Sequence, residues 1–148
     1  MIIDPNSVPK QSSTNYPKEF QHWVKGRTKQ KIGNAAGLHN FGVNLVTLQP
    51  GSYSSIRHWH ITQDEFIYVI AGEIILIDNR GEHLLKAGDC AGFPAGEANG
   101  HHLCNKSSQV AQYLEIGDRS SSDVVTYPDI DLVAKNSETG WIFDSQES

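Results

Sequence analysis

The sequence of 148 residues lacks several features that would assign a protein to a class. Only two cysteines are present, Cys90 and Cys104, which excludes a disulfide-rich secreted domain and a zinc site built from cysteine pairs. Its apolar runs are much shorter than the roughly 20 residues that a helix needs to cross a bilayer. The net charge of −5 lacks the positive excess of nucleic-acid-binding domains. We therefore expect neither a membrane nor a nucleic-acid partner.

The N-terminus, MIIDPNSVPK, has no basic stretch followed by an apolar segment, so it does not resemble a secretory signal. We expect a cytoplasmic protein, and in that reducing compartment two free thiols rather than a disulfide. A hydrophobic content of 38% is ordinary for a folded protein, and the length is that of a single domain.

Helical periodicity is missing from the whole of residues 38–117. This region contains short segments rich in β-branched and aromatic residues, such as FGVNLVTL, EFIYVIAGEIILID and AQYLEIG. Turn-forming sequences separate them, and DNRG at residues 78–81 predicts a hairpin. Many short strands at close spacing indicate an all-β sandwich or barrel.

The flanks of this region are polar, which divides the chain into an N-terminal arm (1–34), a barrel (35–118) and a C-terminal tail (119–148). We expect the arm to pack on the outside of the barrel. Spaced apolar residues in the tail predict that it packs on the barrel or on a second subunit. Within the arm, YPKEFQHWVKGR is compatible with a short helix or with an extended segment.

Four basic residues alternate with other residues near the end of the arm: Lys25, Arg27, Lys29 and Lys31. Such a pattern is typical of the solvated face of an edge strand, and also of a strip that binds anions. We favour the solvated face.

The segment RHWH raises the question of a metal site. In a strand, His58 and His60 would share one face while Trp59 takes the other. Their Cα atoms would lie roughly 6.6–7 Å apart, from which two imidazoles can converge on one ion. A pair of surface histidines would give the same pattern, so the surrounding spacing must decide.

That spacing resembles the first signature of the cupin superfamily, in which Gly, His-any-His, Glu and Gly follow at set intervals. Here the positions are Gly51, His58, His60, Glu65 and Gly72, with one extra residue between the first two. Glu65 is preferred to its neighbour Asp64 because only Glu65 gives the six-residue step to the last glycine.

Downstream, GDCAGFPAGEANGHHLCN resembles the second cupin signature, but Asn99 stands where the histidine is usual. His101 is followed after three residues by Asn105, which preserves the second half of the signature. We interpret this as a two-residue insertion, with Gly100 supplying the backbone freedom to absorb it. Strand alternation then predicts that His101 points into the barrel and His102 points out.

The resemblance implies an all-β jelly-roll barrel, also called a double-stranded β-helix, with a metal in its mouth. It implies one divalent transition metal (zinc, manganese, iron, nickel or cobalt), whose predicted ligands are His58, His60, Glu65 and His101. Residues 42–117 carry the resemblance, and further similarity extends to a small bacterial group labelled as sugar-phosphate isomerases. Small cupins usually pair, and apolar residues in polar flanks favour a homodimer: Trp23, Ile130, Trp141 and Phe143.

Three side chains are candidates for contact with a substrate: Arg57, Tyr68 and Tyr113. The first two could meet an anion, although a surface or hydrophobic role fits each of them, and Tyr113 is equally compatible with the mouth and the core. We expect the partner of this protein to be a small-molecule substrate or ligand, and three functions remain open. They are a metal-dependent enzyme related to sugar-phosphate isomerases, an iron-dependent dioxygenase of a small organic acid or thiol, and a sensor that binds without turnover.

Overall fold

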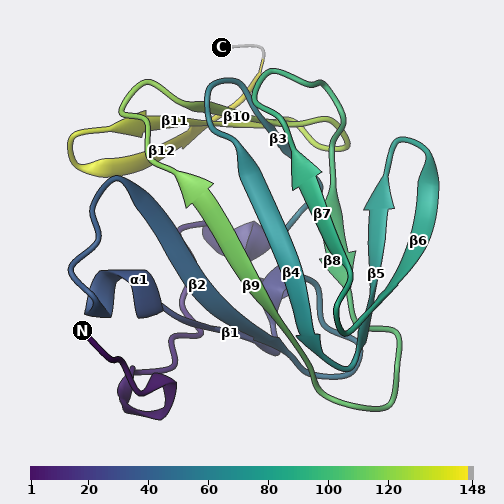
Figure 1. The fold of residues 1–148 in the computed structure, drawn as a ribbon. Coiled ribbons are helices and arrows are strands. Elements are labelled where there is room, and N and C mark those ends of the chain that lie inside the picture. The colour runs from purple at the N-terminus through teal and green to yellow at the C-terminus, as the bar shows by residue number, and fades with distance from the viewer. Residues whose placement is uncertain (147–148) are drawn as a thin grey trace.

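The computed structural model describes residues 1–146, and its chain is built almost entirely of strands (Figure 1). The strands are β1 (Arg27–Gln30), β2 (Phe41–Leu48), β3 (Trp59–His60), β4 (Glu65–Ala71), β5 (Glu73–Asp78), β6 (Gly81–Lys86), β7 (Cys90–Phe93), β8 (His102–Cys104), β9 (Ala111–Asp118), β10 (Val124–Tyr127), β11 (Leu132–Ser137) and β12 (Gly140–Asp144). The helices are two 3-10 segments, η1 (Pro5–Ser7) and η2 (Lys18–Val24), and one turn of α-helix, α1 (Ile32–Ala35).

Within residues 1–146, all strand pairings are antiparallel, and they form three sheets. The strand orders are β1-β2-β9-β4-β7, β12-β11-β10-β3 and β6-β5-β8. Sequence neighbours such as β3 and β4 therefore lie in different sheets, as the chain crosses between the walls of a jelly roll. The predicted all-β jelly-roll fold is confirmed.

Alternation along the strands builds the interior. In β4, Ile67 and Val69 are buried, while Phe66, Tyr68 and Ile70 are exposed on the other face. The buried residues join a main core with side chains from β2, β5, β8 and β9. Because that core is apolar and closely packed, it fixes the register of the strands that carry the polar interior residues.

The predicted hairpin lies between β5 and β6. Asp78 pairs with Gly81, so Asn79 and Arg80 form a two-residue loop. Gly81 has a φ of 116°, which a residue with a side chain rarely adopts, and this explains a glycine at that turn.

The C-terminal tail contributes to the barrel wall. β10 pairs with β3, and β11 and β12 extend the same sheet across the upper end of the barrel in Figure 1. Residues 147–148 of the predicted tail lie outside the described residues. Four flank residues on which the homodimer prediction was based pack against a second core within this chain: Trp23, Ile130, Trp141 and Phe143.

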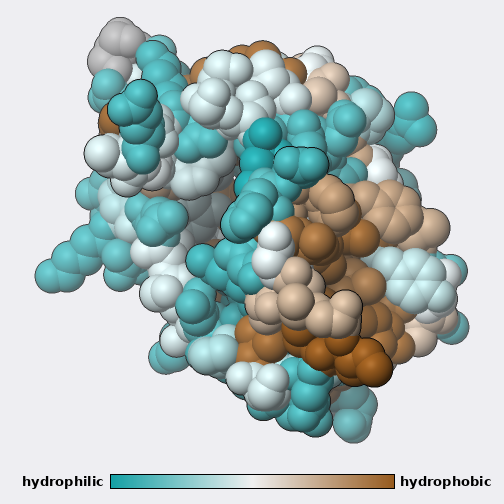
Figure 2. All heavy atoms as spheres, turned by 60° about the vertical axis from the view of Figure 1, so that its left-hand side comes forward, coloured by the Kyte–Doolittle hydropathy of each residue, from teal (hydrophilic) through white to brown (hydrophobic). Residues whose placement is uncertain are grey.

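The outer face of the five-stranded sheet carries several exposed apolar side chains. Phe66, Tyr68 and Ile70 of β4 and Phe41 of β2 are each exposed by about two fifths. Figure 2 shows a broad apolar area on the right of that view. Within residues 1–146, no helix has the length and apolar character needed to span a membrane.

Candidate metal centre

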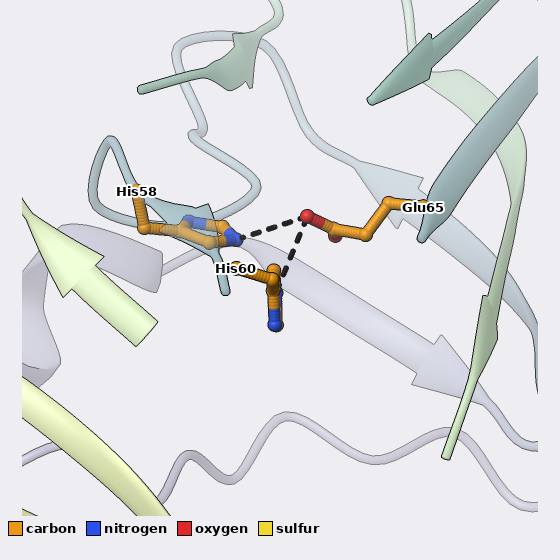
Figure 3. Close-up of side chains that lie close together, drawn as sticks. All are labelled: His58, His60 and Glu65. Carbon is orange, nitrogen blue, oxygen red and sulfur yellow. Dashed lines mark ion pairs between the residues drawn. The ribbon is translucent and has the colours of Figure 1, made fainter. Parts of the chain in front are cut away.

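Three neighbouring segments of the barrel bring the candidate ligands together. His60 lies on β3, Glu65 begins β4, and His58 forms an isolated antiparallel bridge with His101 just before β8. The side chains of His58, His60 and Glu65 point toward one another in Figure 3. One ligand atom from each of these three lies within 4.8 Å of the others, so the group could hold a single metal ion.

The imidazoles converge on one carboxylate oxygen. Glu65 Oε1 lies 3.6 Å from His58 Nε2 and 3.2 Å from His60 Nε2. His101 Nε2 lies 3.0 Å from the same oxygen. His101 is 5% exposed, and its ring stacks on that of Phe93. The structure thus brings the four predicted ligand residues to one place.

The neighbouring alternatives point elsewhere. His102 Nδ1 donates to the backbone oxygen of Ser55, and its ring lies against Tyr53. Asn99 bonds to the hairpin between β5 and β6, through the backbone of Asn79 and the side chain of Asp78. Asp64 accepts a hydrogen bond from the backbone of Ala95.

Each imidazole of the group is oriented by its second nitrogen. His58 Nδ1 lies 2.8 Å from the carbonyl oxygen of Ile56, and His101 Nδ1 lies 3.0 Å from that of Asn99. Because a carbonyl oxygen only accepts, both Nδ1 atoms must carry the proton. An Nε2 atom without a second proton then offers its lone pair to a metal, which is the usual arrangement in metal sites, and a protonated Nε2 atom donates to Glu65 instead.

His60 is oriented by a carboxylate that sequence reasoning missed. Its Nδ1 donates to Asp123 Oδ2 over 2.5 Å, and Asp123 is 1% exposed. The other oxygen of Asp123 accepts from the backbone and hydroxyl of Thr62. The only signal was an acid just before an apolar strand of the tail, and nothing in the sequence linked it to His60.

Burial and hydrogen bonding compete at Glu65. Burial disfavours its ionised form, but hydrogen bonds from His101 and His58 outweigh that effect and hold the pKa of Glu65 well below its ordinary value. Burial also lowers the pKa of His58, and the adjacent Glu65 more than reverses this, so the net direction is upward. The site between Glu65 and the imidazoles therefore favours a positive charge, which either a proton or a metal ion can supply.

The group opens on a cavity of about 950 Å³, large enough for a small metabolite. A second carboxylate, Glu115, lines it from β9. Lys29 Nζ and Asn44 Nδ2 donate to Glu115 Oε1 over 3.0 and 3.1 Å. Burial raises the pKa of Glu115, but Lys29 and Asn44 bring it below its ordinary value. The strand period could have revealed Glu115, because it lies two residues after Tyr113.

The prediction of a solvated basic face in the arm holds for Lys25 and Lys31, which are exposed, but was wrong for Arg27 and Lys29. β1 is an edge strand, as expected, yet Arg27 and Lys29 face inward and line the cavity. Arg27 is only 7% exposed. The sheet curves so that the inner face of its edge strand, β1, closes the barrel. The alternation of basic residues in the sequence could not indicate this curvature.

The three candidate substrate contacts lie in different places. Tyr113 lines the cavity and is 1% exposed, so it belongs to both the core and the site. Arg57 is held outside the cavity by both carboxylate oxygens of Asp129, at 2.8 and 2.7 Å. Tyr68 lies on the outer face of β4. Of these three, only Tyr113 lines the cavity on which the metal-binding group opens.

Gly100 has a different role from the one expected. It does not have the positive φ that requires a glycine. A Cβ atom there would lie 2.8 Å from Pro128 Cγ and 2.9 Å from an Arg57 nitrogen. Close packing, rather than backbone freedom, accounts for the glycine before His101.

Comparison with known proteins agrees with this architecture. The model of the cupin domain family matches residues 44–117, half of the chain. No curated protein matches the sequence. Together with the full-length relative described next, the match shows that this chain belongs to the cupin superfamily.

That relative, from Silicibacter pomeroyi, is described as a sugar phosphate isomerase from a cupin superfamily. It is 38% identical, with a TM-score of 0.97 over 100% of this chain and 94% of its own. A protein from Acidithiobacillus ferrooxidans with a provisional sugar phosphate isomerase description is 29% identical, with a TM-score of 0.77 over 82% and 78%. The polyketide cyclase RemF from Streptomyces resistomycificus shares the fold alone, at 19% identity and a TM-score of 0.66 over 80% and 78%.

Proposed function

We propose that this protein is a metal-dependent enzyme that isomerises a small sugar phosphate. The observation that carries the proposal is the convergence of three Nε2 atoms on Glu65, with a further, half-buried carboxylate, Glu115, in the same cavity. The relatives described as sugar phosphate isomerases support the choice of substrate class. A cytoplasmic location agrees with it, since Cys90 and Cys104 are both free thiols.

The donor set fits a divalent first-row transition metal, because imidazole nitrogens and one carboxylate suit zinc, manganese, iron, nickel or cobalt. His58, His60, Glu65 and His101 would hold it. When bound, such an ion acts as a Lewis acid on a hydroxy-carbonyl group.

Glu115 is the group that we assign to proton transfer. Its pKa is lowered by Lys29 and Asn44 against the effect of burial, so the carboxylate is ionised at neutral pH and can accept a proton. In an aldose–ketose interconversion it would take the proton from the hydroxyl-bearing carbon and return it to the former carbonyl carbon. The hydroxyl proton moves to the former carbonyl oxygen, so atoms and electrons balance without an oxidant.

The proposal is tested on untagged protein by metal analysis, followed by isomerase assays on aldose and ketose phosphates under air and under nitrogen. Turnover that depends on the metal, is indifferent to oxygen and falls strongly in Glu115→Gln is the expected result. Stoichiometric iron with oxygen consumption would favour the dioxygenase instead. Tight metabolite binding without turnover would favour a sensor.

A further inference from the structure

The inner end of the cavity contains a buried cation without an acidic partner. Arg27 donates from one terminal nitrogen to the backbone oxygen of Ser54 at 2.7 Å, and from the other to that of Ser13 at 3.4 Å. No acidic side chain within residues 1–146 forms an ion pair with it. Burying a charge without a counter-charge is costly, so a position of this kind needs an explanation.

Two buried polar atoms at the same end have no hydrogen-bond partner within the described part of the chain. They are Arg27 Nε and Tyr113 Oη, and both residues line the cavity. Burial and Glu115 raise the pKa of Tyr113 well above its ordinary value, while the charge of Arg27 and the nearby Ser54 hydroxyl oppose them. The phenol is neutral at physiological pH and is therefore a hydrogen-bond donor.

The strand register places these donors relative to the metal-binding group. On β4 and β9, Glu65 is opposite Gly117, and Val69 is opposite Tyr113. The backbone of Tyr113 therefore lies four residues from the level of Glu65, which is about 13 Å along the strands at roughly 3.3 Å per residue. Lys29 shares that level through its pairing with Val46 of β2, and Arg27 lies two residues deeper.

We propose that Arg27 and Tyr113 form a subsite for the anionic group, phosphate or carboxylate, of a small ligand whose other end reaches the candidate metal centre. Arg27 Nε and Tyr113 Oη supply unused donors to that anion, whereas Lys29, at the same level as Tyr113, is already paired with Glu115. Glu115 then lies between the two ends, beside the carbon atoms of the ligand. The inference rests on the proposed function only for the chemical identity of the part of the ligand that reaches the metal centre.

The test is calorimetric titration of the full-length protein, as purified, with D-fructose 6-phosphate, gluconate, inorganic phosphate and uncharged fructose. Arg27→Gln should weaken anion binding about tenfold or more, because a charge-assisted hydrogen bond is lost. Tyr113→Phe removes only a hydroxyl without a partner, and should weaken it about two- to fivefold. The control Arg80→Gln removes an exposed charge from the β5–β6 loop and should leave binding within about twofold of wild type.

A preference for fructose 6-phosphate over gluconate assigns the subsite to phosphate, and the reverse assigns it to carboxylate. The subsite is overturned if no anion binds the wild type, if fructose binds as well as its phosphate, or if both variants bind like wild type. Zinc affinity should be unchanged in both variants. Anion binding with the expected dependence but without conversion would leave the subsite standing and reject the isomerase. Conversion that is unaffected by Arg27→Gln would support the isomerase and reject the subsite.

Discussion

His60 and Asp123 are separated by 63 residues in the sequence, yet His60 Nδ1 donates to Asp123 Oδ2 over 2.5 Å. Asp123 immediately precedes β10, whose strand pairs with β3, the strand that ends at His60. The C-terminal tail therefore orients a candidate metal ligand, in addition to closing one end of the barrel.

Asp123→Asn should lower zinc affinity about 10- to 100-fold, because the partner of a ligating imidazole sets its orientation and basicity. Competition with a fluorescent chelator measures this in protein stripped of metal. Asp129→Asn is the matched control, since Asp129 pairs with Arg57 outside the cavity. Equal losses in the two variants would contradict a specific role for Asp123.

His101→Ala should lower metal affinity sharply, whereas His102→Ala should barely affect it. The reason is that His101 Nε2 lies 3.0 Å from Glu65, while His102 bonds to the backbone of Ser55. Each variant controls for the other, as both replace a buried imidazole beside the same strand. Metal-induced shifts in melting temperature provide an independent measurement. The opposite ranking would show that His101 is not a ligand.

Glu115→Gln should destabilise the protein at neutral pH by removing the ionic partner of Lys29. The pKa of Glu115 is lowered in the folded state, so its contribution is present above the ordinary value of 4.5 and disappears as the pH falls through the lower folded value. Urea unfolding of metal-free protein should show a difference from wild type that is largest at about pH 7 and smallest at about pH 3.

Glu82→Gln is the control for that series, because the exposed Glu82–Lys106 pair should contribute little to stability at any pH. A difference for Glu115→Gln that grows on acidification would show that its carboxylate is not ionised in the folded protein.

The homodimer stays a prediction, but we now expect a different surface of the protein to form its interface. The flank tryptophans pack within the chain, so the exposed apolar face of β4 is now the best interface. Light scattering at micromolar concentration should report a dimer, and Ile70→Lys should give a monomer. Ile142→Lys replaces an exposed residue on another sheet and should leave the dimer intact. A monomeric wild type would refute this interface.

Much of the fold and part of the candidate site follow from local sequence rules. Turn residues and β-branched segments predict strands, and the period of two predicts which side chains share a face, as with His58 and His60 or with the alternating residues of β4. The spacing around Glu65 was sufficient to select it over Asp64, because these residues lie on one short stretch of chain.

Only the tertiary structure decided which face is the inside and which distant segments meet there. Alternation groups Arg27 with Lys29, but the curvature of the sheet determines that this face of an edge strand closes the barrel rather than meeting water. Asp123 reaches His60 only because β10 pairs with β3. Such long-range pairings depend on packing of the whole core, and a local pattern contains no information about the partner that a strand will find.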